Sequence, residues 1–135
     1  MNSSPDSNVG PVTDAVVPSG RDRVIDAIRS TGLCLITDDR LPIHELLDAT
    51  RAALTGGVRL LQYRDKRSMG RKFLEQARLV QALCKEYGAA FVVNDHTDVA
   101  LVLGADGLHL GQDDLPPVEA RKIVGEEMAI GLSIS

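Results

Sequence analysis

Short aliphatic runs alternate along the chain with segments whose apolar residues recur at helical spacing. Runs with the length and composition of buried strands predict five strands, at 33–37, 58–63, 89–93, 106–110 and 128–133. Apolar residues at helical spacing predict five helices, at 21–30, 46–54, 69–87, 97–103 and 116–124. This alternation is typical of an α/β protein with a parallel sheet and right-handed crossovers.

The number of strand–helix units decides between two parallel architectures. No glycine-rich dinucleotide loop follows the first predicted strand, which disfavours an open nucleotide-binding sheet. A closed TIM-type (β/α)8 barrel has eight units and about 200 residues or more. With five units in 135 residues, we interpret residues 21–135 as the first part of such a barrel, an incomplete barrel domain. Residues 1–20 are rich in Ser, Pro, Asp, Asn and Gly and predict a disordered tail.

Composition narrows the class of protein. Apolar residues make up 44% of the chain and aromatic residues only 3%, so we expect an aliphatic core. A net charge of −4 argues against a broad nucleic-acid surface, and no apolar run approaches the ~20 residues that span a membrane. Cys34 and Cys84 lie in apolar segments without C-x-x-C spacing, which favours buried free thiols in a reducing cytoplasm over a disulfide.

Polar and cationic residues follow the second predicted strand. In parallel α/β folds, ligands bind at the carboxyl ends of the strands. Because a strand alternates its faces, Gln62, Arg64 and Lys66 are expected on one side. A guanidinium and an ammonium group together suit a pyrophosphate. The spacing alone favours another interpretation, a solvated loop with a salt bridge to Asp65.

Acidic residues follow the third and fourth predicted strands. Asn94 and Asp95 are typical of a cap for the next helix, although Asp95 could also bind a hard cation. Asp113 and Asp114 could begin a helix or face Asp95 across the strand ends. Two carboxylates opposite Arg64 and Lys66 would make a Mg²⁺–pyrophosphate site. His109 is equally compatible with packing and with ligand binding, and no zinc-type cluster or Ser-His-Asp arrangement is recognisable.

Four segments in order resemble the thiamine phosphate synthase family. They are Leu35–Asp38, Gln62–Lys66, Val93–Asp95 and Gly104–Asp114, and the resemblance extends over Leu33–Ser133. Each segment lies at a predicted strand or at its end. The family joins 4-amino-2-methyl-5-hydroxymethylpyrimidine pyrophosphate to a thiazole phosphate, giving thiamine phosphate and pyrophosphate.

The resemblance implies a role for each matching residue. Those expected to hold the pyrimidine pyrophosphate are Gln62, Tyr63, Arg64, Asp65, Lys66, Asn94 and Ser133. Asp95 and Asp114 are expected to bind Mg²⁺. Arg64 and Lys66 would stabilise charge on the departing pyrophosphate, and no protein acid, base or nucleophile is required.

The sequence also departs from the family pattern. Ile134 and Ser135 follow Ser133, where the family usually has Thr-His or a similar pair. The sixth to eighth strands are absent, and with them the loops expected to bind the thiazole phosphate and a further pyrophosphate-binding lysine. Two alternatives stay open: a thiazole tautomerase of the same fold, and a catalytically incompetent fragment or assembly module. A homo-oligomer is also compatible with the sequence.

Overall fold

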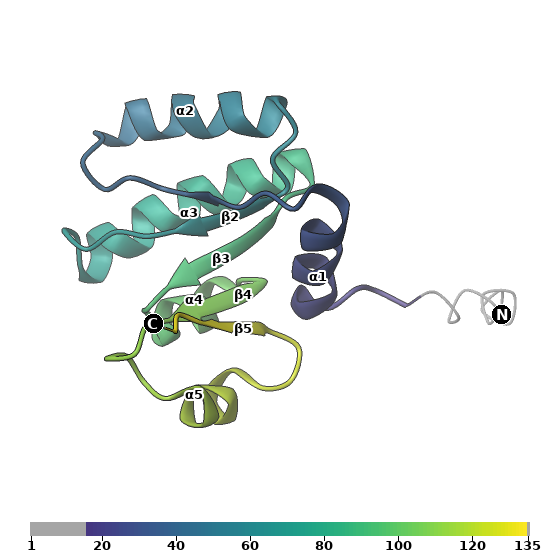
Figure 1. Cartoon of the computed structure of the whole chain (residues 1–135). Helices are drawn as coiled ribbons and strands as arrows, with labels where there is room; N and C mark the ends of the chain where they lie inside the picture. The colour runs from purple at the N-terminus through teal and green to yellow at the C-terminus, as the bar shows by residue number, and fades with distance from the viewer. Residues whose placement is uncertain (1–15, 135) are drawn as a thin grey trace, which may run out of the picture.

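The computed structural model describes residues 16–134, and Figure 1 shows strands and helices alternating along this part of the chain. The elements in chain order are α1 (Gly20–Thr31), β1 (Leu35–Ile36), α2 (Ile43–Thr55), β2 (Leu60–Tyr63), α3 (Gly70–Tyr87), β3 (Ala90–Asn94), α4 (Thr97–Leu103), β4 (Gly107–Leu110), α5 (Pro117–Val124) and β5 (Ala129–Leu132). Each predicted strand and helix is present, and no bound differs from the prediction by more than three residues.

The strands form one sheet in the order β1-β2-β3-β4-β5, and every neighbouring pair is parallel. The prediction of an α/β fold with a parallel sheet is therefore confirmed. Parallel pairing brings all the carboxyl ends of the strands to the same edge of the sheet. The register aligns Asn94 of β3 with His109 of β4, so polar residues from neighbouring strands meet at that edge.

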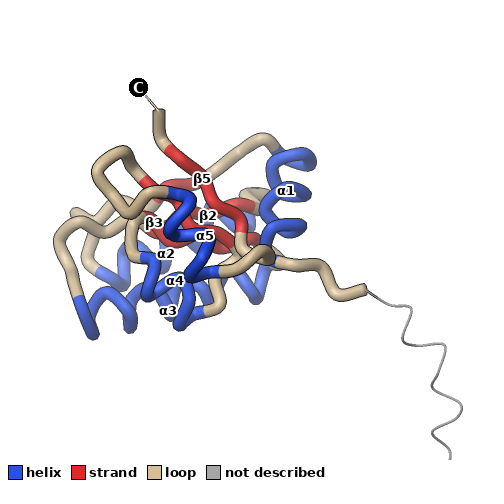
Figure 2. The backbone as a smooth tube through the Cα atoms, turned by 90° about the horizontal axis from the view of Figure 1, so that it is seen from below, coloured by secondary structure: helices blue, strands red, loops and turns tan. Residues whose placement is uncertain are grey.

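Two cores form because successive strand residues point to opposite faces of the sheet. On one face, Leu61, Phe91 and Val93 pack with residues of α2, α3 and α4. On the other face, Leu60, Ala90 and Val92 pack against Val24 and Ala27 of α1. Figure 2 accordingly shows α1 lying apart from the other four helices. The first core includes an edge-to-face contact between Tyr63 and Phe73, with ring centroids 5.1 Å apart, a geometry that contributes ~0.5–1.5 kcal/mol beyond burial.

The start of α1 corrects the predicted tail. The Ser19 hydroxyl accepts a hydrogen bond from the backbone N–H of Asp22, and the Asp22 carboxylate accepts one from the backbone N–H of Ser19. This capping box begins the helix at Gly20, which is buried, so Ser19 and Gly20 belong to the folded domain. Predicted tail residues 1–15 lie outside the described residues.

The first strand is shorter than predicted, and this corrects the placement of one cysteine. The run 33–37 gives only a two-residue edge strand, and Leu33 is exposed. Cys34 precedes the strand and is exposed, whereas Cys84 in α3 is buried as predicted, and both thiols are free. An apolar run does not distinguish an edge segment from a central strand. Within residues 16–134, no helix is long and apolar enough to cross a membrane.

Candidate active site

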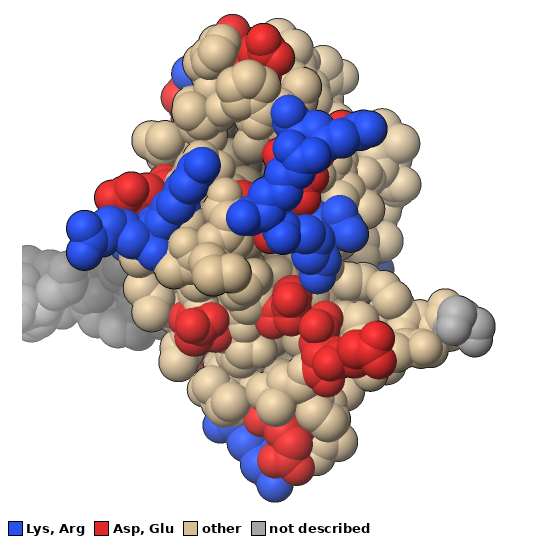
Figure 3. Space-filling model, turned by 90° about the vertical axis from the view of Figure 1, so that its left-hand side faces the viewer, with Lys and Arg blue, Asp and Glu red and all other residues tan. Residues whose placement is uncertain are grey.

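The carboxyl edge of the sheet carries two groups of opposite charge. Figure 3 looks onto this edge and shows Lys and Arg side chains gathered beside a band of Asp and Glu side chains. One contact between basic and acidic residues at this edge joins the Lys66 ammonium to an Asp95 carboxylate oxygen, at 3.4 Å. The structure thus places the residue that follows β3 beside the loop that follows β2.

Asp95 and Asp114 form a hydrogen-bonded carboxyl pair. Burial raises the pKa of Asp95, and the hydrogen bond and negative charge of Asp114 raise it further. The hydrogen bond from Asp95 lowers the pKa of Asp114, as does the backbone N–H of Gly111, which lies 2.6 Å from an Asp114 carboxylate oxygen. Asp95 therefore holds its proton more tightly than Asp114 does.

Local backbone geometry places Asp95 in this pair. Its φ angle is 75°, and its N–H donates to the carbonyl oxygen of His109 at 2.8 Å. Aspartate tolerates this left-handed conformation better than most residues do. The N-cap of α4 is His96, without a side-chain cap hydrogen bond. The capping interpretation of Asn94 and Asp95 was therefore wrong.

Gln62 and Asn94 are joined on the α1 side of the sheet. Both are buried, and the Asn94 side-chain amide donates to the Gln62 side-chain oxygen at 3.0 Å. Gln62 and His109 line a cavity of about 590 Å³ between α1 and the strands. This cavity is largely apolar, and Gln62 and His109 provide polar groups to its wall.

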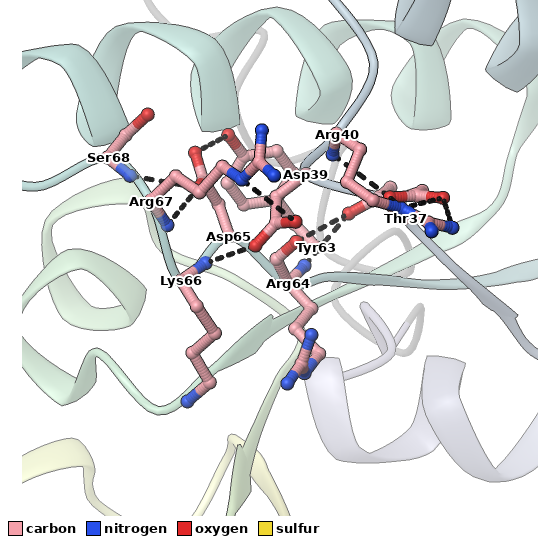
Figure 4. Close-up of polar contacts among 10 residues, drawn as sticks. Thr37, Asp39, Arg40, Tyr63, Arg64, Asp65, Lys66, Arg67 and Ser68 are labelled. Carbon is pink, nitrogen blue, oxygen red and sulfur yellow. Dashed lines mark hydrogen bonds and ion pairs between the residues drawn. The ribbon is translucent and has the colours of Figure 1, made fainter.

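The loop after β2 is held by residues that the sequence interpretation did not assign. The Thr37 hydroxyl accepts from the Arg64 backbone N–H at 2.9 Å and donates to the Arg64 carbonyl oxygen at 3.2 Å. Asp39 accepts from the Lys66 backbone N–H at 2.8 Å. Figure 4 shows the Arg64 and Lys66 side chains extending away from Asp65. The predicted salt bridge to Asp65 was wrong, since the partner of Lys66 is Asp95. The sequence signal for these two residues was the position of Thr37 at the end of the first predicted strand and of Asp39 just after it.

The side chains of Tyr63 and Asp65 lie away from the Lys66–Asp95 contact, and the substrate-binding role expected of them stays a prediction. Tyr63 is 1% exposed and packs in the helix-covered core. Its hydroxyl donates to Asp65 at 3.2 Å, and burial together with the charge of Asp65 raises the pKa of Tyr63. Asp65 also accepts the backbone N–H groups of Arg67 and Ser68. Although burial opposes it, these hydrogen bonds keep the pKa of Asp65 low, and the carboxylate orders the loop.

Ser133 is paired with His109 from the neighbouring strand. The distance between the Ser133 hydroxyl and His109 Nε2 is 2.7 Å. A methyl group at Gly131 would approach His109 Nδ1 to 2.7 Å, so the glycine leaves room for the ring. The structure thus gives His109 a polar partner, which the sequence left undecided.

Asp95 and Asp114 together offer hard oxygen ligands. Over residues 16–134, no group of three or more His, Cys, Asp or Glu side chains could hold a metal ion. A site made of protein ligands alone is therefore disfavoured for these residues. Mg²⁺ does not require one, because it binds one or two carboxylates and completes its shell with water and phosphate oxygens. The pair fits such an ion, since a cation would offset the repulsion that raises the Asp95 pKa.

The matched family agrees with the residues at this edge. A family model described as thiamine monophosphate synthase matches residues 33–135. The chain belongs to this family. The resemblance seen in the sequence is thereby confirmed, and the family match includes β1 to β5 and every residue of the proposed site.

Individual members of the thiamine monophosphate synthase family match a similar part of the chain. A thiamine-phosphate synthase of Halalkalibacterium halodurans is 49% identical over 107 residues, covering 78% of this chain and 51% of the relative. One from Clostridium perfringens is 45% identical over 102 residues, covering 76% and 49%. The solved thiamine phosphate pyrophosphorylase of Pyrococcus furiosus is 38% identical with a TM-score of 0.68, covering 75% and 48%. The chain therefore spans about half the length of these relatives.

Proposed function

We propose that this chain provides the pyrimidine pyrophosphate and Mg²⁺ half-site of a thiamine phosphate synthase. The complete reaction would condense 4-amino-2-methyl-5-hydroxymethylpyrimidine pyrophosphate with a thiazole phosphate, giving thiamine phosphate and pyrophosphate. The observation that carries the proposal is the contact of Lys66 with Asp95, beside Asp114, at one end of the sheet. Family membership supports the choice of reaction.

The chemistry requires charge stabilisation more than proton transfer. The C–O bond to the pyrophosphate breaks with its electron pair on the leaving group, and the thiazole nitrogen supplies the pair for the new C–N bond. Arg64 and Lys66 would stabilise the negative charge on the departing oxygens. Lys66 is well placed because Asp39 anchors its backbone while its side chain extends to Asp95.

Two residue pairs would orient the substrate beside the charged groups. Gln62 lines the cavity and is hydrogen-bonded to the buried Asn94, and the pair would offer hydrogen bonds to a polar heterocycle. Ser133 follows β5 and is aligned by His109 of β4. It would contact the pyrophosphate or the pyrimidine ring. A bound Mg²⁺ would supply Lewis-acid stabilisation of the pyrophosphate oxygens, and Asp95 and Asp114 would hold it.

The five units are proposed to form part of a (β/α)8 barrel. The parallel order β1-β2-β3-β4-β5 is the order in which a barrel sheet is built. Its α1-covered face has an open, apolar cavity of about 590 Å³, as expected of a barrel interior that further strands would enclose. Two free thiols, one of them exposed, support a reducing compartment such as the cytoplasm.

A binding experiment tests the half-site directly. Titration calorimetry would measure binding of the pyrimidine pyrophosphate to the chain with Mg²⁺ in excess. Asp114→Asn is expected to weaken binding at least about tenfold, because it removes a metal-binding charge. Asp113→Asn is the matched control, since Asp113 is the neighbouring exposed carboxylate, and it should bind as the wild type does. Equal losses in the two variants, or no binding by the wild type, would contradict the proposal.

A further inference from the structure

A second cavity, more polar than the one beside α1, lies outside the cluster of Lys66, Asp95 and Asp114. Its volume is about 500 Å³, and it lies between the loop after β1 and the first turns of α3. Four cationic residues line it together with two acidic residues, Asp39 and Asp65. Basic residues thus outnumber acidic ones in its lining, although the chain as a whole is acidic.

The two carboxylates of the cavity are already engaged within the protein. Asp65 accepts hydrogen bonds from Tyr63, Arg67 and Ser68. Asp39 accepts the backbone N–H of Lys66 at 2.8 Å. Both carboxylates are therefore held in fixed positions by these hydrogen bonds.

Two of the cations are available to a ligand. Lys72 has no ion-pair partner among residues 16–134. Arg67 has only a long contact of 3.9 Å with Asp39, and its side chain is 65% exposed. Arg40, by contrast, is paired with Asp38 through two nitrogens. A guanidinium and an ammonium group next to a polar hollow are the donors that bind phosphate oxygens.

We propose that this cavity binds a phosphate dianion, as inorganic phosphate or as the phosphate of a monoester, between Arg67 and Lys72. The Gln76 side chain also lines the cavity and offers a neutral hydrogen-bond donor. Figure 4 shows that Arg64 and Lys66 extend away from Ser68 and Asp65, so they do not serve this cavity with their charged ends. The site is therefore separate from the half-site at the strand ends.

Asp39 connects the two sites. One of its oxygens holds the Lys66 backbone, and the other lies 3.9 Å from Arg67. A phosphate bound by Arg67 would compete with Asp39 for that guanidinium group. Phosphate bound in the cavity would thus affect the loop that carries Lys66, because Asp39 contacts both Arg67 and that loop.

Nuclear magnetic resonance titration of the whole chain with sodium phosphate, without Mg²⁺, tests the site. The backbone amide signals of Arg67, Ser68 and Lys72 are expected to shift and saturate, while sodium chloride at equal ionic strength should leave them unchanged. Lys72→Ala should raise the dissociation constant at least about tenfold, because a direct charge-assisted contact is lost. Arg71→Ala is the matched control: it removes the same charge from the adjacent exposed position, which does not line the cavity.

Two results would overturn the proposal. Equal weakening by Lys72→Ala and Arg71→Ala would show diffuse attraction to surface charge instead of a site. Shifts confined to Lys66, Asp95 and Asp114 would place phosphate in the half-site alone. Lys72 is exposed on α3, so its replacement leaves the fold intact, and the unperturbed amide spectrum of the variant would verify this.

Discussion

The carboxyl group of Asp95 forms a hydrogen bond with the carboxylate of Asp114, and the two residues hold their protons unequally. Burial and the neighbouring charge raise the pKa of Asp95, whereas the hydrogen bond from Asp95 lowers that of Asp114. Without a bound cation, ionising Asp95 places two negative charges side by side. The pair is therefore a source of instability that a divalent ion would remove.

Replacing Asp95 by Asn is expected to stabilise the metal-free chain near neutral pH. The folded-state pKa of Asp95 lies above its ordinary value of 3.8, so its ionisation penalises the folded state. The penalty is absent below that ordinary value and is complete above the raised pKa. Asn retains a donor for Asp114 and tolerates the φ angle of 75°. Thermal unfolding should give a higher Tm for Asp95→Asn at neutral pH and an equal Tm well below pH 3.8.

Added Mg²⁺ provides the complementary measurement. Saturating Mg²⁺ should raise the Tm of the wild type, because the ion binds only the folded state, and should not raise that of Asp95→Asn. Asp113→Asn is the control and should respond to Mg²⁺ as the wild type does. A lower Tm for Asp95→Asn in the metal-free state would show that the carboxyl pair is not repulsive.

Much of the fold could be predicted from hydrophobic periodicity, but the segment beside the edge strand and the start of α1 could not. The central strands are buried on both faces, so their apolar runs were unambiguous. Leu33 and Cys34 have the same apolar character but lie beside an edge strand and are exposed. Gly20 looked like part of a polar tail because its burial depends on Asp106, which is distant in sequence.

The candidate site was predictable where strand geometry alone determines position. Parallel strands bring Lys66 and Asp95 to one edge, and the contact between them follows. Alternation along β2 also explains why Tyr63 points into the helix-covered core although its neighbour Gln62 faces α1. A positive φ at Asp95 and the anchoring of the loop by Thr37 depend on tertiary contacts that no local pattern reveals.

The buried hydrogen bond between Asn94 and Gln62 should contribute measurably to stability. Replacing either residue by Ala leaves the other with an unpaired buried group, at a cost of about 1–3 kcal/mol. The double variant should lose less than the sum of the two single losses, with a coupling of about 0.5–3 kcal/mol. Urea unfolding measures each value.

Gln81 supplies a control for that coupling. Its side-chain amide donates to the Leu103 carbonyl oxygen at 2.8 Å, away from the Gln62–Asn94 pair. The losses caused by Gln62→Ala and Gln81→Ala should therefore add. Additive losses for Gln62→Ala and Asn94→Ala would instead mean that the two amides do not support each other.

Gly20→Ala is expected to destabilise the chain by loosening α1 from the sheet. A methyl group at this position would lie 2.7 Å from backbone atoms of Asp106, which cannot move without disturbing the start of β4. We expect a loss of about 1–3 kcal/mol, typical of overpacking. Gly56→Ala is the matched control, because its φ angle of −77° suits Ala and its nearest contacts are 3.5 Å. It should be neutral or stabilising by up to about 1 kcal/mol, and similar Tm values for the two variants would contradict the packing of α1.

The two thiols should differ in reactivity. Cys34 is exposed, whereas Cys84 is buried in α3, where burial and then the charge of Asp106 raise its pKa to about 12. Burial also raises the pKa of Cys34, so Cys34 should react more slowly than a fully solvated thiol. Its reaction should still be much faster than that of Cys84. With a chromogenic disulfide reagent at mildly alkaline pH, we expect one thiol per native chain to react and the second to react only after denaturation. Cys34→Ser should eliminate the first phase. A first phase that persists in this variant, or that consumes both thiols of the native chain, would show that α3 does not shield Cys84.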